Sequence, residues 1–363
     1  MSTHARTVSV VGGGVIGLAI AWRAARDGWA VRLYDPSIGS GASWVAGGML
    51  APPLSEGWPG EETALTIGAA SLERWPTFGE ELGKFGQSVF TADSSLTVAL
   101  DTADAQDLQT IAEWVSSQGG HELEVLGRAR IRELEPMLGR GGIRSGLMAV
   151  GESAVDNRLL LAALQKACAE SGVELIARAV DDLAELDTDQ IVLTAGIASP
   201  KLWPGLPVRP VKGEILRLRS RPGVTPPAPS RTIRGSVHGR PAYLVPRGDG
   251  IVVGATQYES GEDTQVTMAG VRDLINDAEA LMPAIGEYEL YECAAGLRPM
   301  TPDNLPLIGR VSDRVVVSTG HGRNGVLLTP VTADATVALL NGTSLVEVKG
   351  TEPERFAVAK ENS

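Results

Sequence analysis

The sequence pattern that most limits the fold of this chain lies near its N-terminus. An apolar run at residues 8–11 leads directly into a glycine-rich turn, VVGGGVIG, and residues 15–26 then carry Ala, Leu and Ile at helical spacing. A second apolar run, residues 30–34, follows the end of this helix. Strand, helix and strand in this order and at this length predict a βαβ unit with parallel strands.

The glycines of the turn have separate tasks in such a unit. Gly12 allows a tight turn, Gly14 lets a pyrophosphate approach the backbone, and Gly17 lets helix and strand pack closely. The amide groups at the helix start attract phosphate. An acid at the end of the second strand accepts hydrogen bonds from ribose hydroxyls and argues against a 2′-phosphate. The sequence therefore predicts a dinucleotide site that includes Gly12, Gly14, Val15, Ile16, Gly17 and Asp35.

Size, charge and cysteine content exclude several other classes. With 363 residues the chain exceeds the roughly 250 to 300 residues at which one core stops growing, so we expect two domains. The net charge of −12 would repel nucleic acids and anionic membrane surfaces, so we expect neither as a partner. Cys168 and Cys293 form no paired motif and the histidines show no ligand spacing. We therefore expect no metal and a cytoplasmic location.

The apolar stretch at residues 8–22 has one competing interpretation. It follows basic residues and superficially resembles a secretory signal. Its four glycines, the lack of a suitable cleavage site and a length below the roughly 18 apolar residues of a membrane span favour strand, turn and helix instead. We therefore expect no targeting segment and no membrane span.

Two further glycine-rich segments favour FAD over NAD as the dinucleotide. Residues 39–52, GSGASWVAGGMLAP, follow the ribose-binding position, where FAD enzymes run their chain along the pyrophosphate. Residues 318–330, STGHGRNGVLLTP, form a second glycine-rich turn that opens a helix. A helix start at this place would stabilise negative charge on a reduced flavin. A plain glycine loop is the alternative for the second turn.

The remaining pattern alternates between helix–strand units and strands in series. This predicts an α/β fold, α+β overall, in which a Rossmann-like FAD-binding domain is interleaved with an antiparallel-sheet substrate domain. We assign the FAD-binding domain to residues 1–87, 150–207 and 295–345, the substrate domain to 88–149 and 208–294, and a C-terminal tail to 346–363. The expected helices beyond the first are 61–86, 104–117, 156–172, 268–281 and 325–340.

Short motifs connect these segments to a known family. After VVGGGVIG and AGGMLAP the chain carries, in order, VDNRLL (155–160), VLTAG (192–196), RPVKGEILRL (209–218), YLVPR (243–247), VVGAT (252–256), AGLRP (295–299), TPDNLPLIG (301–309) and GHGRNGVLL (320–328). With this order and spacing, nearly the whole chain resembles the glycine oxidase (ThiO) branch of the D-amino-acid oxidase superfamily of flavoproteins.

The resemblance implies an amino-acid substrate beside the flavin. Arg298, in AGLRP, matches the arginine that holds the substrate carboxylate, and a planar guanidinium can bind both of its oxygens. Tyr243, in YLVPR, matches a tyrosine whose hydroxyl donates a third hydrogen bond. Arg323 matches a residue near both substrate and flavin. The resemblance thus makes these three residues the expected catalytic set.

The resemblance also implies a pocket wall and further cofactor contacts. Met49 and Gln257 are the expected wall residues, and Val180 is expected beside the adenine. Gln257 stands at a position that varies in the family, and Pro241 replaces a histidine of some members, so the preferred amine stays open. The implied cofactor contacts are Ala42, Ser43, Gly47, Gly48, Met49, Val180, His321, Gly322, Arg323, Asn324, Gly325, Val326 and Leu327.

The flavin is expected to be bound without a covalent bond. Related sarcosine oxidases attach it through a cysteine just before the TPD element. Met300 stands at this place, and Cys293 lies too far upstream. The resemblance therefore implies non-covalent FAD.

The implied reaction is the oxidation of glycine or another small amino acid, such as sarcosine or a D-amino acid. The imine formed would hydrolyse to a 2-oxo acid and ammonia, and oxygen would be reduced to hydrogen peroxide. The resemblance also implies a place in thiamine (thiazole) biosynthesis, a functional link to thiazole synthase and a homotetramer. Two alternatives stay open: a D-amino-acid dehydrogenase that uses an acceptor other than oxygen, and a flavin-binding protein without catalytic turnover.

Overall fold

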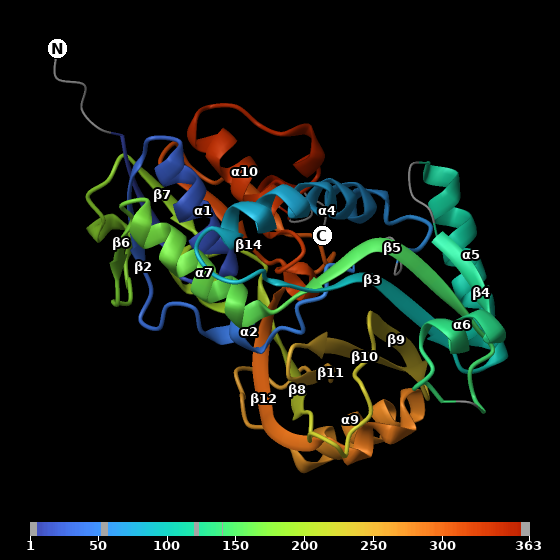
Figure 1. Cartoon of the computed structure of the whole chain (residues 1–363). Helices are drawn as coiled ribbons and strands as arrows, with labels where there is room; N and C mark the ends of the chain where they lie inside the picture. The colour runs from blue at the N-terminus through green and yellow to red at the C-terminus, as the bar shows by residue number, and fades with distance from the viewer. Residues whose placement is uncertain (1–5, 52–56, 120–122, 140, 357–363) are drawn as a thin grey trace.

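The computed structural model describes residues 6–51, 57–119, 123–139 and 141–356 and contains two sheets. The first has six strands in the order β13-β14-β7-β1-β2-β6 (Figure 1). Its neighbours pair in parallel except for β13 and β14, which pair antiparallel. The bounds are β1 Thr7–Val11, β2 Ala30–Tyr34, β6 Glu174–Ile176, β7 Gln190–Leu193, β13 Leu307–Arg310 and β14 Val315–Thr319.

Helices from distant parts of the chain pack on this sheet. Helix α1 (Val15–Arg26) contacts both α7 (Asn157–Glu170) and α10 (Thr329–Leu340), and α4 (Glu62–Gly83) contacts α7 and α10. Helix α1 is buried on most sides because its small and aliphatic residues face these neighbours. Trp22 meets Phe78 of α4 edge to face, with ring centroids 5.4 Å apart. These four helices therefore share one core with the sheet (Figure 1).

The second sheet has eight strands in the order β12-β8-β11-β10-β9-β3-β5-β4. All of its pairs are antiparallel except β3 and β9, which run parallel. Helix α9 (Met268–Leu281) packs on β8, β9, β10 and β11, and α5 (Thr102–Gln118) and α6 (Arg128–Leu134) pack at the β4 end. The bounds are β3 Phe90–Ala99, β4 Leu123–Gly127, β5 Ser145–Val155, β8 Arg209–Arg219, β9 Thr232–Val237, β10 Arg240–Arg247, β11 Gly250–Gly254 and β12 Glu289–Met300.

The short helix α2 (Gly41–Val45) and the residues after it connect the two sheets. Helix α2 packs against α7 and against β12, and Met49 forms a backbone bridge with Ala154 of β5. Strands β5 and β12 belong to the eight-stranded sheet and extend across the proposed domain limits at 149/150 and 294/295. The residue limits given for the two domains stay a proposal.

The fold class predicted from the sequence is confirmed, with one helix start corrected. The pattern predicted a helix from Gly325, but residues 322–324 form a short 3-10 helix and α10 begins only at Thr329. Pro330 lies in the first turn of α10, the place in a helix where its missing N–H costs nothing. The short helices are α8 Ser199–Leu202, η1 Leu183–Glu185, η2 Gly196–Ala198, η3 Pro283–Glu287, η4 Gly322–Asn324, η5 Val346–Val348 and η6 Pro353–Phe356.

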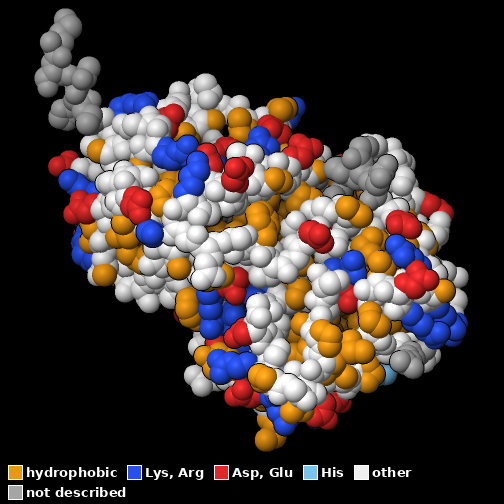
Figure 2. Space-filling view, in the orientation of Figure 1, with side chains coloured by type: hydrophobic (Ala, Val, Ile, Leu, Met, Phe, Trp, Pro, Cys, Tyr) orange, Lys and Arg blue, Asp and Glu red, His pale blue; other side chains and the backbone are white. Residues whose placement is uncertain are grey.

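On the face shown in Figure 2, acidic and basic side chains are interspersed. Part of the predicted tail, 346–356, forms two 3-10 turns, and 357–363 lie outside the described residues. Within the described ranges, every helix is too short or too polar to serve as a membrane span.

Candidate active site

The N-terminal glycine turn has the geometry of a phosphate cradle. Gly12 has φ +113°, a conformation that L side chains rarely adopt, and a Cβ at this position would collide with the backbone of Thr194. A Cβ at Gly17 would collide with the carbonyl oxygen of Gly12. Helix α1 starts at Val15 with no side-chain cap from Gly14, although the Val15 N–H donates to Ser43 Oγ at 3.0 Å. The turn therefore presents bare backbone at a helix start, which suits a pyrophosphate.

The predicted adenosine end lies beside this turn. Asp35 follows β2, and its carboxylate accepts hydrogen bonds from the N–H groups of Gly13 and Ser37, both at 2.7 Å. Val180 is buried in a cluster with Tyr34 and Val11. The carboxylate thus orders the glycine turn itself, and the contacts of Asp35 with ribose and of Val180 with adenine stay predictions.

The second glycine turn lies at the start of the C-terminal helix segment. Gly320 and Gly322 both have positive φ, and His321 between them forms a backbone bridge with Met300. The His321 ring is 4% exposed and makes a hydrogen bond of 3.1 Å with Thr332 Oγ1. Burial lowers the pKa of His321 to about 3, so the ring is neutral at physiological pH. His321 thus holds the turn in place without adding charge.

Two glycines of the eight-stranded sheet leave room for the predicted substrate residues. A Cβ at Gly213 would collide with the guanidinium of Arg298, and a Cβ at Gly254 would collide with the phenol ring of Tyr243. Arg298 Nη1 donates to the carbonyl oxygens of Thr256 at 3.1 Å and Lys212 at 3.4 Å. Both side chains therefore lie across bare backbone. The motifs RPVKGEILRL and VVGAT contain these glycines, but sequence reasoning gave them no role.

The electrostatics set Arg298 and Tyr243 apart from ordinary surface residues. Burial lowers the pKa of Arg298, and the charge of Arg323 lowers it further. Burial raises the pKa of Tyr243, although the nearby cation Arg298 opposes this. With the described residues Arg298 makes hydrogen bonds to carbonyl oxygens and no ion pair. Its charge and the phenol proton are thus available for an anionic ligand.

Arg323 and a further arginine lie near these residues. The Arg323 side chain is exposed, and its charge acts on Arg298 and on Arg234. Arg234 of β9 is paired directly with Tyr243 across the strands and is 8% exposed. Burial, with the charge of Arg323, lowers the pKa of Arg234 to about 10. Sequence reasoning missed Arg234, since only the register of β9 and β10 brings it beside Tyr243.

The two predicted wall residues have different surroundings. Met49 is partly buried, and its backbone is bridged to Ala154. Gln257 is exposed just after β11, whereas the carbonyl of its neighbour Thr256 contacts Arg298. The place of either side chain in a substrate pocket stays a prediction.

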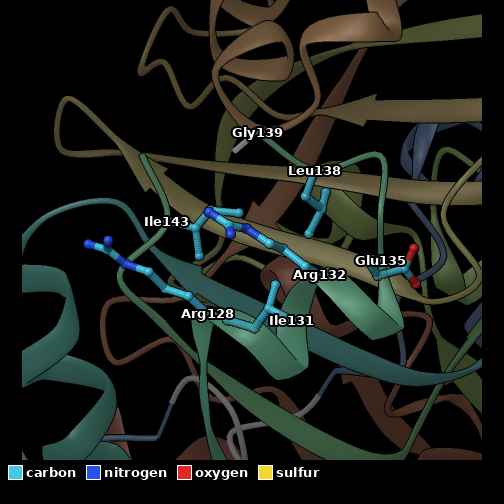
Figure 3. Close-up of a pocket in the computed structure, with 7 residues that line it drawn as sticks. All are labelled: Arg128, Ile131, Arg132, Glu135, Leu138, Gly139 and Ile143. Carbon is cyan, nitrogen blue, oxygen red and sulfur yellow. The ribbon is translucent and has the colours of Figure 1, made fainter. Parts of the chain in front are cut away.

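Two hollows lie away from Arg298. The pocket shown in Figure 3, beside α6, has a volume of about 10 Å³, enough for a single water molecule. Its Glu135 accepts hydrogen bonds from Ser230 and Arg231 and so has a structural role. A larger groove, of about 610 Å³, lies between α4 and strands β3 and β5, with Trp75 and Phe90 in its lining. Neither hollow is lined by the predicted catalytic residues.

Comparison with known proteins decides the family. A family model described as FAD dependent oxidoreductase (DAO) matches residues 7–339. The chain belongs to the DAO family of FAD-dependent oxidoreductases. It is 30% identical to a glycine oxidase of Geobacillus kaustophilus over 91% of each chain. The crystal structure of glycine oxidase from the same organism superposes with a TM-score of 0.87 at 26% identity, covering 96% of this chain and 99% of that one.

Other relatives of this DAO-family chain carry names from thiamine biosynthesis. A ThiO oxidoreductase of Rhizobium etli is 33% identical over 90% of this chain and 94% of its own length. The bifunctional protein ThiO/ThiG of Synechocystis is 31% identical over 90% of this chain but only 50% of its own length. The chain thus spans about half the length of the bifunctional relatives.

The residues present fit the cofactor of the family. Helix α1 starts without a side-chain cap from Gly14, and a Cβ at Gly14 would lie 3.1 Å from Ser43 Oγ, so the backbone of this turn suits a pyrophosphate. When bound, FAD supplies the electron acceptor for oxidation of a substrate C–H bond. The protein is therefore an FAD-dependent oxidoreductase, and the residues that hold each part of the cofactor are those proposed above.

Proposed function

We propose that this enzyme oxidises glycine or another small amino acid, such as sarcosine or a D-amino acid, at its CH–NH bond. The observation that carries the proposal is the pair Arg298 and Tyr243, of which Arg298 lies over Gly213 and Tyr243 over Gly254 in the eight-stranded sheet. A guanidinium bonded only to carbonyl oxygens, beside a protonated phenol, is suited to a carboxylate ligand. The glycine oxidase relatives support an amino acid as that ligand.

In the proposed reaction the chain's own residues bind and orient the substrate. Arg298 holds the carboxylate, and the Tyr243 hydroxyl donates one further hydrogen bond to it. Together they would fix Cα in one position and leave the amine to be oxidised in its neutral form. Burial keeps Tyr243 protonated, so it remains a donor at neutral pH. Orientation and exclusion of water are therefore the main contributions of the protein.

The acceptor and the metabolic role belong to the same proposal. We assign oxygen as the acceptor, with hydrogen peroxide as its product, and the imine as the precursor of a 2-oxo acid and ammonia. The names of the ThiO and ThiO/ThiG relatives support a functional link to thiazole synthase. Homo-oligomerisation, as a homotetramer, and a cytoplasmic location with two unpaired cysteines stay predictions.

One anaerobic experiment tests the reaction. The visible spectrum of the purified holoenzyme is recorded, and glycine, sarcosine, D-alanine or D-proline is added without air. We expect bleaching of the flavin, followed by recovery and peroxide release when oxygen is admitted. Bleaching without recovery would identify a dehydrogenase with another acceptor. A flavin that none of the four amines reduces would contradict the amine oxidase proposal.

A further inference from the structure

The segment of residues 43–48, which crosses between the two sheets, is held by residues that the proposed reaction does not use. Asn157, the first residue of α7, donates from Nδ2 to the carbonyl oxygens of Ser43 and Trp44, both at 2.8 Å. Asn157 is 1% exposed. One buried amide group therefore binds two successive carbonyls of this segment, and it belongs to VDNRLL, a motif without an assigned role.

Arg247 holds the other end of the segment. Its Nη2 donates to the Gly47 carbonyl oxygen at 2.7 Å, and its Nη1 donates to the carbonyl of Pro246. A Cβ at Gly47 would lie 2.8 Å from the Tyr243 hydroxyl, and Arg247 ends the strand, β10, that carries Tyr243. The same strand thus supplies a substrate residue and an anchor for the segment.

Arg217 of β8 supports the Asn157 anchor. Its Nη2 donates to Asn157 Oδ1 at 2.9 Å, which orients the amide so that Nδ2 faces Ser43 and Trp44. Arg217 and Arg247 are both buried, at 9% and 8% exposure. The segment is therefore held by Asn157 of α7, which Arg217 orients, and by Arg247 of the eight-stranded sheet.

The charges around these anchors are matched by acids. Arg247 Nε lies 3.4 Å from Asp156 Oδ2, and Arg158 makes two hydrogen bonds to the Glu292 carboxylate, at 2.6 and 2.9 Å. Burial lowers the pKa of Arg217, and the acids Asp156 and Glu292 oppose this. The cations of this cluster thus have carboxylates nearby within the fold, and their terminal nitrogens bind backbone and the Asn157 amide.

We propose that Asn157, Arg217 and Arg247 are positioning residues that hold the 43–48 segment against the substrate sheet and thereby set the affinity for FAD. The proposal goes beyond the amine reaction and rests only on the assignment of residues 42–49 to the cofactor site. Because Gly47 lies against the Tyr243 hydroxyl, the same anchors would also fix the position of the cofactor relative to Tyr243.

The test is FAD release from the holoenzyme without any amine. Holoenzyme is diluted in steps and free flavin is measured by fluorescence, for wild type, Arg247→Met, Arg247→Lys and Asn157→Ser. We expect FAD affinity to fall roughly 10- to 100-fold in Arg247→Met, since a buried charge-assisted bond is lost, less in Asn157→Ser, and to recover in part in Arg247→Lys. Thermal unfolding of each protein controls for folding, and Asn157→Ser serves if Arg247→Met does not fold.

The matched control is Arg219→Met on β8, whose half-exposed side chain pairs with Asp249 and stacks on Tyr291. It should retain wild-type FAD affinity. Unchanged affinity in both Arg247→Met and Asn157→Ser would overturn the proposal, as would equal losses in the Arg219→Met control. Since no amine is present, failure of the proposed amine reaction leaves this result unaffected.

Discussion

Arg298 and Arg247 lie on strands of the same sheet, Arg298 partly buried and Arg247 buried, and their partners differ. Arg247 has a carboxylate, Asp156, 3.4 Å from its Nε and donates to the carbonyls of Gly47 and Pro246. Arg298 donates to carbonyls of Thr256 and Lys212 and makes no ion pair with any described residue. One cation has a carboxylate nearby within the fold, and the other has none among the described residues.

The difference separates structure from ligand binding. Removing an ion from water costs several kcal/mol unless a counter-charge is near. Taking away one partner of a buried ion pair destabilises the fold by about 3 to 5 kcal/mol. Arg247 recovers part of this cost within the folded chain. In the proposed function, Arg298 recovers it when the substrate carboxylate binds as its counter-charge. The same residue type would then serve folding in one place and binding in the other.

The largest effect is expected from Arg298→Met. Loss of the carboxylate partner should cost about 2 to 5 kcal/mol of transition-state stabilisation. This lowers kcat/KM for the best amine roughly 30-fold to several thousand-fold. The free energy of unfolding should change little or rise, since an uncompensated charge is removed. Steady-state kinetics and urea unfolding measure the two quantities. Arg209→Met, at an exposed arginine paired with Glu259, is the control; wild-type kinetics in Arg298→Met would remove Arg298 from the site.

The next effect is expected from Asp156→Asn and should fall on stability. The substitution keeps a good N-cap for α7 but removes the carboxylate beside Arg247, so we expect the free energy of unfolding to fall by about 1 to 3 kcal/mol. Asp249→Asn, at an exposed acid paired with Arg219, should change it by less than about 0.5 kcal/mol. Equal urea midpoints for Asp156→Asn and Asp249→Asn would mean that the Asp156 carboxylate does not stabilise buried Arg247.

Tyr243→Phe should have the smallest effect of the three. It removes one hydrogen bond donor and leaves the ring in place. Loss of this bond should cost about 0.5 to 1.5 kcal/mol of substrate binding, so we expect KM to rise roughly 2- to 12-fold, with kcat less affected. A drop in stability of similar size without any change in KM would place the hydroxyl outside the substrate site.

The pH profile sharpens this assignment. Burial raises the pKa of Tyr243 above its ordinary value of 10, so the hydroxyl stays protonated and donates throughout the neutral range. The ratio of KM between Tyr243→Phe and wild type should therefore be constant from pH 6 to about 9 and fall only at higher pH, where the wild-type phenol ionises. A ratio that changes near pH 7 would show that another group titrates with the substrate.

The sequence allowed much of the fold to be predicted, because local pattern controls it. The βαβ unit at the N-terminus and the helix at 268–281 carry strong periodicity, and both were confirmed. The start of α10 was predicted four residues too early, since the apolar residues Val326, Leu327 and Leu328 continue the helical pattern into the turn. The parallel pairing of β3 with β9 has no local signal and was not predicted.

The site was harder to predict where it depends on strand register. Motifs identified Arg298 and Tyr243, but Arg234 is brought beside Tyr243 only by the pairing of β9 with β10. Gly213 and Gly254 make room for side chains from other strands, which a single strand does not show. Gln257 in the pocket wall stays a prediction, and the backbone contact of the neighbouring Thr256 with Arg298 was not predicted. The motifs thus indicated which residues to consider for the site, but not which side chains strand pairing brings next to one another.

The strand order of the six-stranded sheet has a consequence for synthesis of the chain. Strand β7 lies between β1 and β14, but β14 follows it only at Val315–Thr319, after all of β8 to β12. A ribosome adding roughly 5 to 20 residues per second would release β14 on the order of ten seconds after β7. During that time one edge of β7 is unpaired, and an open edge invites wrong strand pairing. The nascent chain therefore has to keep a half-built cofactor domain intact until its last parallel strand arrives.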